Sequence, residues 1–285
     1  MIKFINYFIQ SLVIYTLFLI CRILGLRISR KLFAAFFSLV GPLFKSKTII
    51  YKNLNIVSEM YPDIDKEKIF RGMWKNYGMT FVEYIFLGYF RKNTSHVKIN
   101  DNGNLSKINK EKKPVIFISG HFANFELMSM EITKKNIPLA AIYRPLNNIF
   151  LNPLMEFLRR KYVCKNQIKK GIKGVRKVLN YLEKKTCVAL MIDQRLSEGE
   201  KINFFNKSAL TTTLPAQLSI KYNIDIIPVF IKRNLDNNFE IVFQNRISPN
   251  KYKNKLELSE HLNRVLEKMI IQCPYQWIWT HNRWK

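Results

Sequence analysis

The sequence is poor in acidic residues. Among its 285 residues, 20 are Asp or Glu and 47 are Lys or Arg, which leaves a formal net charge of +27. A surplus of this size favours an anionic partner such as nucleic acid, anionic lipid or an acidic protein. The chain is also rich in Lys, Ile and Asn, so a general compositional bias is a second source of the charge.

Cysteine is scarce as well, and its spacing excludes several kinds of site. The four cysteines form no CxxC pair, and no His/Cys cluster has the spacing of metal ligands. We therefore expect reduced, mostly buried thiols, as in a cytosolic compartment, and no metal site. These cysteines are Cys21, Cys164, Cys187 and Cys273.

The signatures of nucleic-acid recognition are also missing. We find no helix-turn-helix, no zinc finger and no aromatic set typical of an RNA-recognition motif. A nucleic-acid-binding protein also has no need of an apolar N-terminus. We expect no nucleic-acid partner, and a basic, membrane-associated nucleic-acid-binding protein is the alternative of another functional class.

The N-terminus, by contrast, has a long apolar run. Residues 5–26 are almost all apolar, which matches the roughly 20 residues that a membrane span needs. No small-x-small cleavage site follows, so the run does not have the pattern of a cleaved signal peptide. Basic residues cluster after it and only Lys3 precedes it, so the positive-inside rule assigns the rest of the chain to the cytoplasm. The basic cluster is Arg22, Arg27, Arg30 and Lys31.

The remaining chain divides by composition. Residues 32–44 are apolar but contain Gly41-Pro42, a pattern typical of an interfacial helix, so we assign residues 1–46 to a membrane anchor and interfacial helix. Residues 47–285 form the second domain, helical over 47–90 and α/β over 114–285. Alternating strands and helices there predict a mostly parallel, doubly wound sheet flanked by helices. The expected strands are 115–118, 139–143, 187–192, 225–231 and 239–243.

The segment Pro114–Glu126 is the centre of this α/β part. Val115–Ile118 is a β-branched and aromatic run typical of a strand buried on both faces. Gly120 permits a sharp turn. Phe125–Thr133 is rich in helix formers, and Asn124 can cap that helix. The pattern predicts a strand, a turn and a helix.

His121 and Glu126 fall at the carboxyl end of the expected strand, where open α/β sheets hold their chemistry. With the histidine in the turn and the glutamate in the first helical turn, the two side chains can meet. The carboxylate would fix the imidazole tautomer, and the other ring nitrogen could accept a proton from a hydroxyl. A structural, hydrogen-bonded histidine is the alternative. His96 and Asp101 have the same spacing but lie in a polar stretch, which we interpret as a solvated loop.

Two further polar residues follow expected strands. Arg144 comes after residues 139–143, and Asp193 comes after residues 187–192. Because the ends of parallel strands meet at one edge, we expect both to converge with His121. Helix capping or an ion pair is the alternative for Arg144, and a plain turn is the alternative for Asp193.

The order of motifs along the chain resembles the late acyltransferases of lipid A biosynthesis, the lauroyl/myristoyl acyltransferase family of the lysophospholipid acyltransferase superfamily. The resemblance covers nearly the whole chain. The matching motifs are Gly-His-Phe-x-Asn-x-Glu from Gly120, Tyr-Arg-Pro from Tyr143, Asp193, Phe-Phe-x5-Thr-Thr-Thr from Phe204, Pro-Val-Phe from Pro228 and Trp-x-His-x-Arg from Trp279.

The resemblance implies an enzyme of the inner membrane with its catalytic domain on the cytoplasmic face. It implies transfer of a fatty acyl group from acyl carrier protein to a hydroxyl of a phosphorylated lipid A precursor. His121 would be the general base and Glu126 its orienting carboxylate. Arg144, Asp193 and Asn124 would bind substrate or the oxyanion. A thioester donor needs no metal, so we expect no cofactor.

Other acceptors stay open at this point. Relatives acylate mannosylated phosphoinositides, and a lysophospholipid is a further alternative acceptor. No serine or cysteine lies in an obvious nucleophile elbow, which favours direct transfer over an acyl-enzyme.

Overall fold

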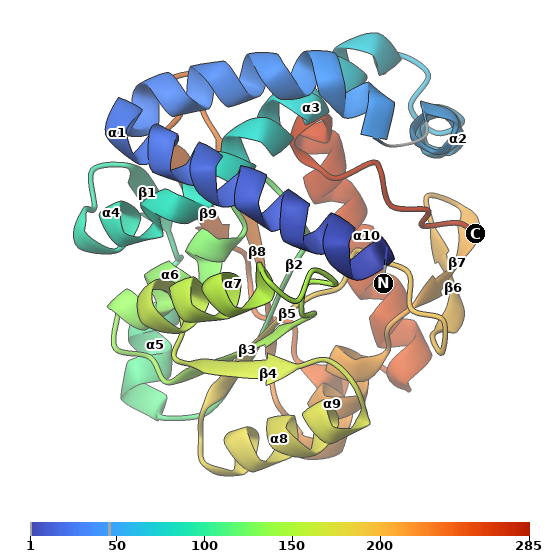
Figure 1. Cartoon of the computed structure of the whole chain (residues 1–285). Helices are drawn as coiled ribbons and strands as arrows, with labels where there is room; N and C mark the ends of the chain where they lie inside the picture. The colour runs from blue at the N-terminus through green and yellow to red at the C-terminus, as the bar shows by residue number, and fades with distance from the viewer. Residues whose placement is uncertain (1, 45–46) are drawn as a thin grey trace.

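A seven-stranded sheet forms the centre of the protein (Figure 1). The computed structural model describes residues 2–44 and 47–285. The strand order is β1-β9-β8-β2-β5-β3-β4, and every neighbouring pair is parallel except β8 and β9. The expectation of a mostly parallel α/β sheet is thus confirmed. The strands are β1 Val97–Asn100, β2 Ile116–Ser119, β3 Leu139–Tyr143, β4 Asn166–Lys169, β5 Cys187–Met191, β8 Ile226–Arg233 and β9 Phe239–Phe243.

Helices separate most of the strands, as a doubly wound sheet requires. A π-helical turn, Arg159–Val163, continues α7. The helices are α1 Ile2–Phe44, α2 Lys47–Ser58, α3 Lys66–Glu83, α4 Leu87–Lys92, α5 Asn104–Glu111, α6 Glu126–Lys134, α7 Asn152–Leu158, α8 Ile172–Glu183, α9 Leu214–Tyr222 and α10 Lys255–Gln272.

The alternation of side chains in and around β2 divides the core into two parts. Ile116 and Ile118 pack into one cluster with apolar residues of α8, α9 and α10. Val115, just before the strand, and Phe117 pack into the other cluster with residues of α4, α5 and α6. Because both faces are covered, this stretch is apolar at consecutive positions rather than at alternate ones.

Several elements differ from the expectation. The strand β4 lies in the basic segment 165–177, which contains none of the expected strands. An antiparallel hairpin, β6 Glu200–Phe204 and β7 Lys207–Thr211, also lies outside the expected strands. The strand β1 lies in the polar stretch 91–113. All of these strands are short and carry Lys or Asn, so sheet pairing decides their conformation more than their own composition does.

Helix α1 combines the expected anchor and the expected interfacial helix. It bends at Gly25, whose φ of 77° and ψ of 166° are not helical. Figure 1 shows the two arms crossing the molecule, the first in dark blue and the second in lighter blue. The predicted boundary between residues 46 and 47 borders residues 45–46, which lie outside the described residues.

The first arm of α1 packs against the α/β part. The Tyr15 hydroxyl donates a hydrogen bond to the Phe150 carbonyl (2.7 Å), and the Asn148 amide donates to the Tyr7 carbonyl (2.9 Å). The opposite face of the arm is exposed and apolar, and by length and composition the stretch Ile2–Leu43 could cross a membrane. Exposed side chains on the helix include Ile5, Ile9, Leu12, Leu19, Ile23, Leu32, Leu39 and Leu43.

The second arm of α1 approaches α3 closely at two glycines. A Cβ atom on Gly78 would lie 2.2 Å from the Phe33 carbonyl oxygen, and one on Gly41 would lie 2.3 Å from the Trp74 ring. Such distances leave no room for a methyl group, so glycine at these positions sets the separation between the two helices.

We predict that Gly78→Ala destabilises the protein, although alanine is the better helix former by about 1 kcal/mol. Forcing α1 away from α3 should lower the free energy of unfolding by about 1–3 kcal/mol, the usual range for overpacking. Circular dichroism during unfolding in detergent micelles measures this. Gly88→Ala is the control, because its Cβ would meet the Tyr162 ring at 3.1 Å, where a side chain can move aside. Equal stability of the two variants would contradict the prediction.

Candidate active site

The strand register brings His121 and Asp193 together. Ser119 at the end of β2 is paired with Met191 at the end of β5. His121 and Asp193 each lie two residues beyond that pair, so they leave neighbouring strands at the same level. The expectation that strand ends converge at one edge of the sheet therefore holds for this pair.

Asp193 is hydrogen-bonded on both carboxylate oxygens. The His121 Nδ1 atom lies 2.8 Å from Oδ1, while Oδ2 accepts from the His121 backbone N–H (2.8 Å) and from the Trp277 indole (2.9 Å). The side chain of Asp193 is 2% exposed and that of His121 is 20% exposed. The aspartate thus holds both the backbone and the ring of the histidine.

The protonation states follow from this arrangement. Burial alone would raise the pKa of Asp193, but His121 and the hydrogen bonds lower it to about 2. Burial would lower the pKa of His121, but the Asp193 carboxylate outweighs it and raises that pKa, with a smaller contribution from Glu126. Because an ionised aspartate only accepts hydrogen bonds, His121 Nδ1 carries the proton and Nε2 is the basic nitrogen.

Glu126 has different partners from those expected. Its Oε1 atom accepts hydrogen bonds from the Tyr84 hydroxyl (2.7 Å) and from Arg159 Nε (2.7 Å). The expected hydrogen bond between Glu126 and His121 is absent among the described residues. The two do not pair because Asp193, just beyond the end of β5, already occupies the Nδ1 side of the ring.

Arg159 connects Glu126 to the π-helical turn. It begins the turn Arg159–Val163, and its Nη2 atom donates to the Tyr84 hydroxyl (3.2 Å). Burial and the Glu126 carboxylate both raise the pKa of Tyr84, so the phenol stays protonated. We did not identify Arg159 from the sequence, where it is one basic residue in Arg-Arg-Lys. The only available signal was its position at the end of an amphipathic helix.

One cavity of about 730 Å³ joins these groups. Its volume falls in the range of ligand-binding pockets. Ile14, Phe18 and Phe81 form part of an apolar wall, while His121, Glu126, Arg144, Arg159, Lys170 and His281 line the polar part. The cavity therefore offers both an apolar surface and a basic nitrogen to a ligand.

Comparison with known proteins identifies the family. The profile of the bacterial lipid A biosynthesis acyltransferases matches residues 2–285. The chain belongs to this family. The resemblance noted from the motifs is thereby confirmed, as is the assignment to acyltransferases.

Individual relatives are distant. The lipid A biosynthesis palmitoleoyltransferase of Escherichia coli (strain K12) is 23% identical over 247 residues, 85% of this chain and 79% of that protein. The lipid A biosynthesis lauroyltransferase of the same organism is 21% identical over 246 residues, 83% of this chain and 78% of that protein. The solved 1-acyl-sn-glycerophosphate (LPA) acyltransferase, PlsC, of Thermotoga maritima has 12% identity and a TM-score of 0.43, covering 89% of this chain and all of that one.

Arg144 and Asn124, two other site residues predicted from the sequence, lie in different surroundings. Arg144 is exposed, lines the cavity and has no ion pair or hydrogen bond from its guanidinium among the described side chains. Asn124 is 1% exposed, and its amide donates to Glu83 Oε2 (2.9 Å). In this acyltransferase Asn124 therefore neither caps α6 nor reaches the cavity, because the amide is bound in a polar network behind the turn.

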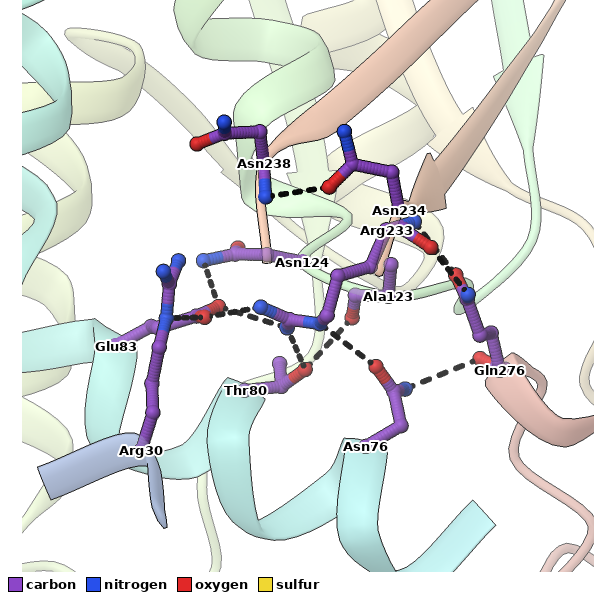
Figure 2. A network of polar contacts seen from close by, with 10 residues as sticks. All are labelled: Arg30, Asn76, Thr80, Glu83, Ala123, Asn124, Arg233, Asn234, Asn238 and Gln276. Carbon is purple, nitrogen blue, oxygen red and sulfur yellow. Dashed lines mark hydrogen bonds and ion pairs between the residues drawn. The ribbon is translucent and has the colours of Figure 1, made fainter. Parts of the chain in front are cut away.

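That network is drawn in Figure 2 and fixes the turn that carries His121. Glu83, on α3, is fully buried and paired with Arg30 of α1 (2.6 Å) and with Arg233 of β8. Burial would raise the pKa of Glu83, but Arg233 and Arg30 lower it, so the carboxylate stays charged.

The same network holds the backbone after His121. The Thr80 hydroxyl donates to the Ala123 carbonyl (2.9 Å; Figure 2). The Ala123 amide donates to the Gln276 carbonyl (3.1 Å). Ala123 has a φ of 41°, in the left-handed region that alanine disfavours. The contacts on both sides of its peptide hold it in this conformation.

His96, whose spacing to Asp101 copies that of the active-site motif, is not in a solvated loop. It is 5% exposed and packs on the Phe90 ring at 4.8 Å between centroids, and burial lowers its pKa to about 4. Asp101 accepts hydrogen bonds from the backbone of Gly103 and Leu105 at the start of α5. The interpretation of His96 as solvated is therefore wrong, because β1 carries it into the core beside β9.

We predict that Asp193→Asn lowers the pKa of His121, because the carboxylate charge is what raises it. Glu126→Gln should lower it less, since Glu126 is paired with Arg159. Nuclear magnetic resonance of a sample with labelled histidine ring carbons measures both titrations, and the chain has only four histidines. A larger shift in Glu126→Gln than in Asp193→Asn would reverse our assignment of the partner.

Proposed function

We propose that the protein transfers a fatty acyl group from acyl carrier protein to a hydroxyl of a lipid A precursor. The observation that carries the proposal is the His121–Asp193 pair on a cavity with an apolar wall, in a chain of the lipid A acyltransferase family. The pair supplies a base, and the apolar wall suits an acyl chain.

The reaction needs no acyl-enzyme. Nε2 of His121 takes the proton of the acceptor hydroxyl while the hydroxyl oxygen attacks the thioester carbonyl carbon. The tetrahedral intermediate then collapses, the C–S bond breaks, and the imidazolium returns the proton to the leaving thiolate. Asp193 stabilises the imidazolium, as a buried carboxylate does in a catalytic triad. A positioned general base contributes about 10²–10⁴-fold to the rate.

We assign Glu126 an indirect role in this scheme. Its carboxylate orients Arg159, whose guanidinium lines the cavity and can stabilise the negative charge that develops on the thioester oxygen. Its own charge also contributes to the raised pKa of His121. The motif glutamate would thus act through the arginine rather than through the imidazole.

We further propose that Arg144 binds a phosphate of the acceptor lipid. Arg144 is exposed on the cavity wall, and a guanidinium can bind phosphate through two parallel hydrogen bonds. Because Arg144 is exposed to water, its unpaired charge carries little energetic cost in the free protein. The charge becomes paired when an anionic ligand enters the cavity.

The acceptor would reach the cavity from a membrane. We propose that the apolar outer face of α1 enters the cytoplasmic leaflet of the bacterial inner membrane, with the rest of the chain in the cytoplasm. The exposed apolar side chains of α1 support this placement, because they would otherwise face water. Ile14 and Phe18 of the same helix line the cavity, which would then open close to lipid.

The test supplies purified protein with a panel of acyl carrier donors and lipid acceptors, and mass spectrometry identifies the acylated product. We expect an acylated lipid A precursor, and His121→Ala should lose at least about 10²-fold in kcat. The double variant His121→Ala/Asp193→Ala should be little slower than His121→Ala, because the two residues act as one unit. An acylated lysophospholipid as the sole product would contradict the proposed acceptor.

The control for the base is His96→Ala. It should keep normal activity per folded molecule, although removal of a buried ring should lower stability. The kcat/KM of the wild-type protein should fall as pH drops through a pKa above the ordinary value for histidine, about 6.5. In Asp193→Asn this fall should move to lower pH. Full activity of His121→Ala would remove the residue from the mechanism.

We predict that Arg144→Ala raises the KM for phosphorylated acceptor and leaves folding intact. A charge-assisted hydrogen bond is worth about 1.5–3 kcal/mol, so KM should rise roughly tenfold to a hundredfold. Arg144→Lys should restore only part of the affinity, since an ammonium lacks the guanidinium fork. A dephosphorylated acceptor is the matched control, because the variants and the wild-type protein should then be equal. An unchanged KM in Arg144→Ala would contradict the assignment.

A further inference from the structure

A basic surface surrounds the start of α8. It consists of Lys170, Lys173, Arg176 and Lys177, next to Ile172, and we call it the α8 patch. All five side chains are exposed, and that of Ile172 is 84% exposed. An isoleucine this exposed buries almost no apolar surface in the folded protein, and basic residues flank it here.

The charges of the α8 patch are not used inside the molecule. None of its four cations forms an ion pair with a described acidic side chain, whereas the neighbouring Lys169 is paired with Glu156 at 3.1 Å. The buried side of α8 is formed by Gly174, Val178 and Leu182, so the patch faces outward. Its positive potential is therefore available to a partner.

The α8 patch borders the catalytic cavity. Lys170 belongs to the patch and also lines the cavity, together with Gln167 of β4. The backbone N–H of Lys170 donates to the Tyr143 carbonyl (2.9 Å), next to Arg144, so the two basic residues flank the same strand end. A partner bound on the patch would lie beside the cavity that holds His121.

The position of the patch favours a protein partner over lipid. Figure 1 shows α8 at the opposite end of the molecule from the second arm of α1, whose exposed face is apolar. A membrane that contacts α1 would leave α8 facing water. A basic surface with one exposed aliphatic side chain is suited to an acidic protein surface with a small apolar contact.

We propose that the α8 patch is the docking surface for the acidic carrier protein that delivers the acyl thioester. This inference rests on the proposed function and adds where the donor binds. The carrier protein approaches from the aqueous side, and its thioester arm enters the cavity beside Lys170. The lipid acceptor arrives from the α1 side, so the two substrates do not compete for one entrance.

The test compares two donors with the same acyl group, dodecanoyl acyl carrier protein and the uncharged thioester dodecanoyl pantetheine. The triple variant Lys173→Glu/Arg176→Glu/Lys177→Glu should raise the KM for the carrier-protein donor by at least roughly tenfold, because electrostatic attraction raises association rates by 10–10³-fold. The KM for the pantetheine donor, which carries no phosphate, and both kcat values should stay within about twofold. Acidic residues near the start of α8 suit its dipole, so folding should be preserved.

The matched control is Lys98→Glu/Lys110→Glu/Lys113→Glu, which changes net charge equally on exposed residues away from the catalytic cavity. It should leave both KM values near those of the wild-type protein. Ile172→Ala tests the apolar contact and should weaken carrier-protein binding several-fold without a change of charge. Biolayer interferometry with acyl carrier protein measures that binding directly, independently of turnover.

The outcomes separate the inference from the function on which it rests. Normal carrier-protein binding by the α8 variant, with transfer intact, would overturn the docking surface and leave the proposed function standing. Loss of binding to anionic vesicles, with normal carrier-protein KM, would overturn it in favour of lipid. Absence of transfer from both donors in the wild-type protein would refute the proposed function, and the binding measurement would still decide whether the α8 patch holds the carrier protein.

Discussion

The buried carboxylate of Glu83 is the constraint on which the arrangement of the active site depends. It is fully buried, and the two arginines that pair with it come from α1 and β8, 53 and 150 residues away in sequence. Removing one partner of such a cluster leaves an uncompensated charge and costs about 3–5 kcal/mol. The Asn124 amide donates a hydrogen bond to the same carboxylate, which ties the turn after His121 to this cluster. Helix α1, the sheet and the turn that carries His121 are therefore held in one relative position.

Sheet order supplies the other half of the site. The His-x4-Glu spacing pointed to Glu126, yet the carboxylate that contacts His121 is that of Asp193, just beyond β5, the strand paired with β2. His121 and Asp193 were each identifiable from the sequence, because each follows a buried strand. Their direct contact was not identifiable, since the sequence does not reveal which strands are neighbours in the sheet. Arg159 and Tyr84 were missed for the same reason, as they meet Glu126 only through tertiary packing.

Local composition predicted the apolar elements well and the polar ones poorly. Residues 139–143 and 239–243 match β3 and β9, since β-branched and apolar side chains dominate both. Strand β4, with Asn-Gln-Ile-Lys, becomes a strand because it pairs along β3. His96 was misjudged because its neighbours in sequence are polar while its neighbours in space, Phe90 and Tyr89, are aromatic. Sequence patterns show which residues precede and follow a position along the chain, whereas burial depends on the residues that pack against it in space.

The positions of Ile14 and Phe18 constrain how the sequence of this protein can change during evolution. Both lie on the apolar helix α1, and both line the cavity that contains His121. A substitution at either position alters the shape of this cavity, and a deletion of the helix removes part of its wall. Phe18 is buried against Phe81, and the exposed apolar side chains lie on the other face of the helix. Under the proposed function, one helix therefore contacts lipid with its outer face and shapes the space for the acyl chain with its inner face. A form shortened to remove the need for detergent would then differ from the intact protein in its choice of acyl chain as well as in its solubility.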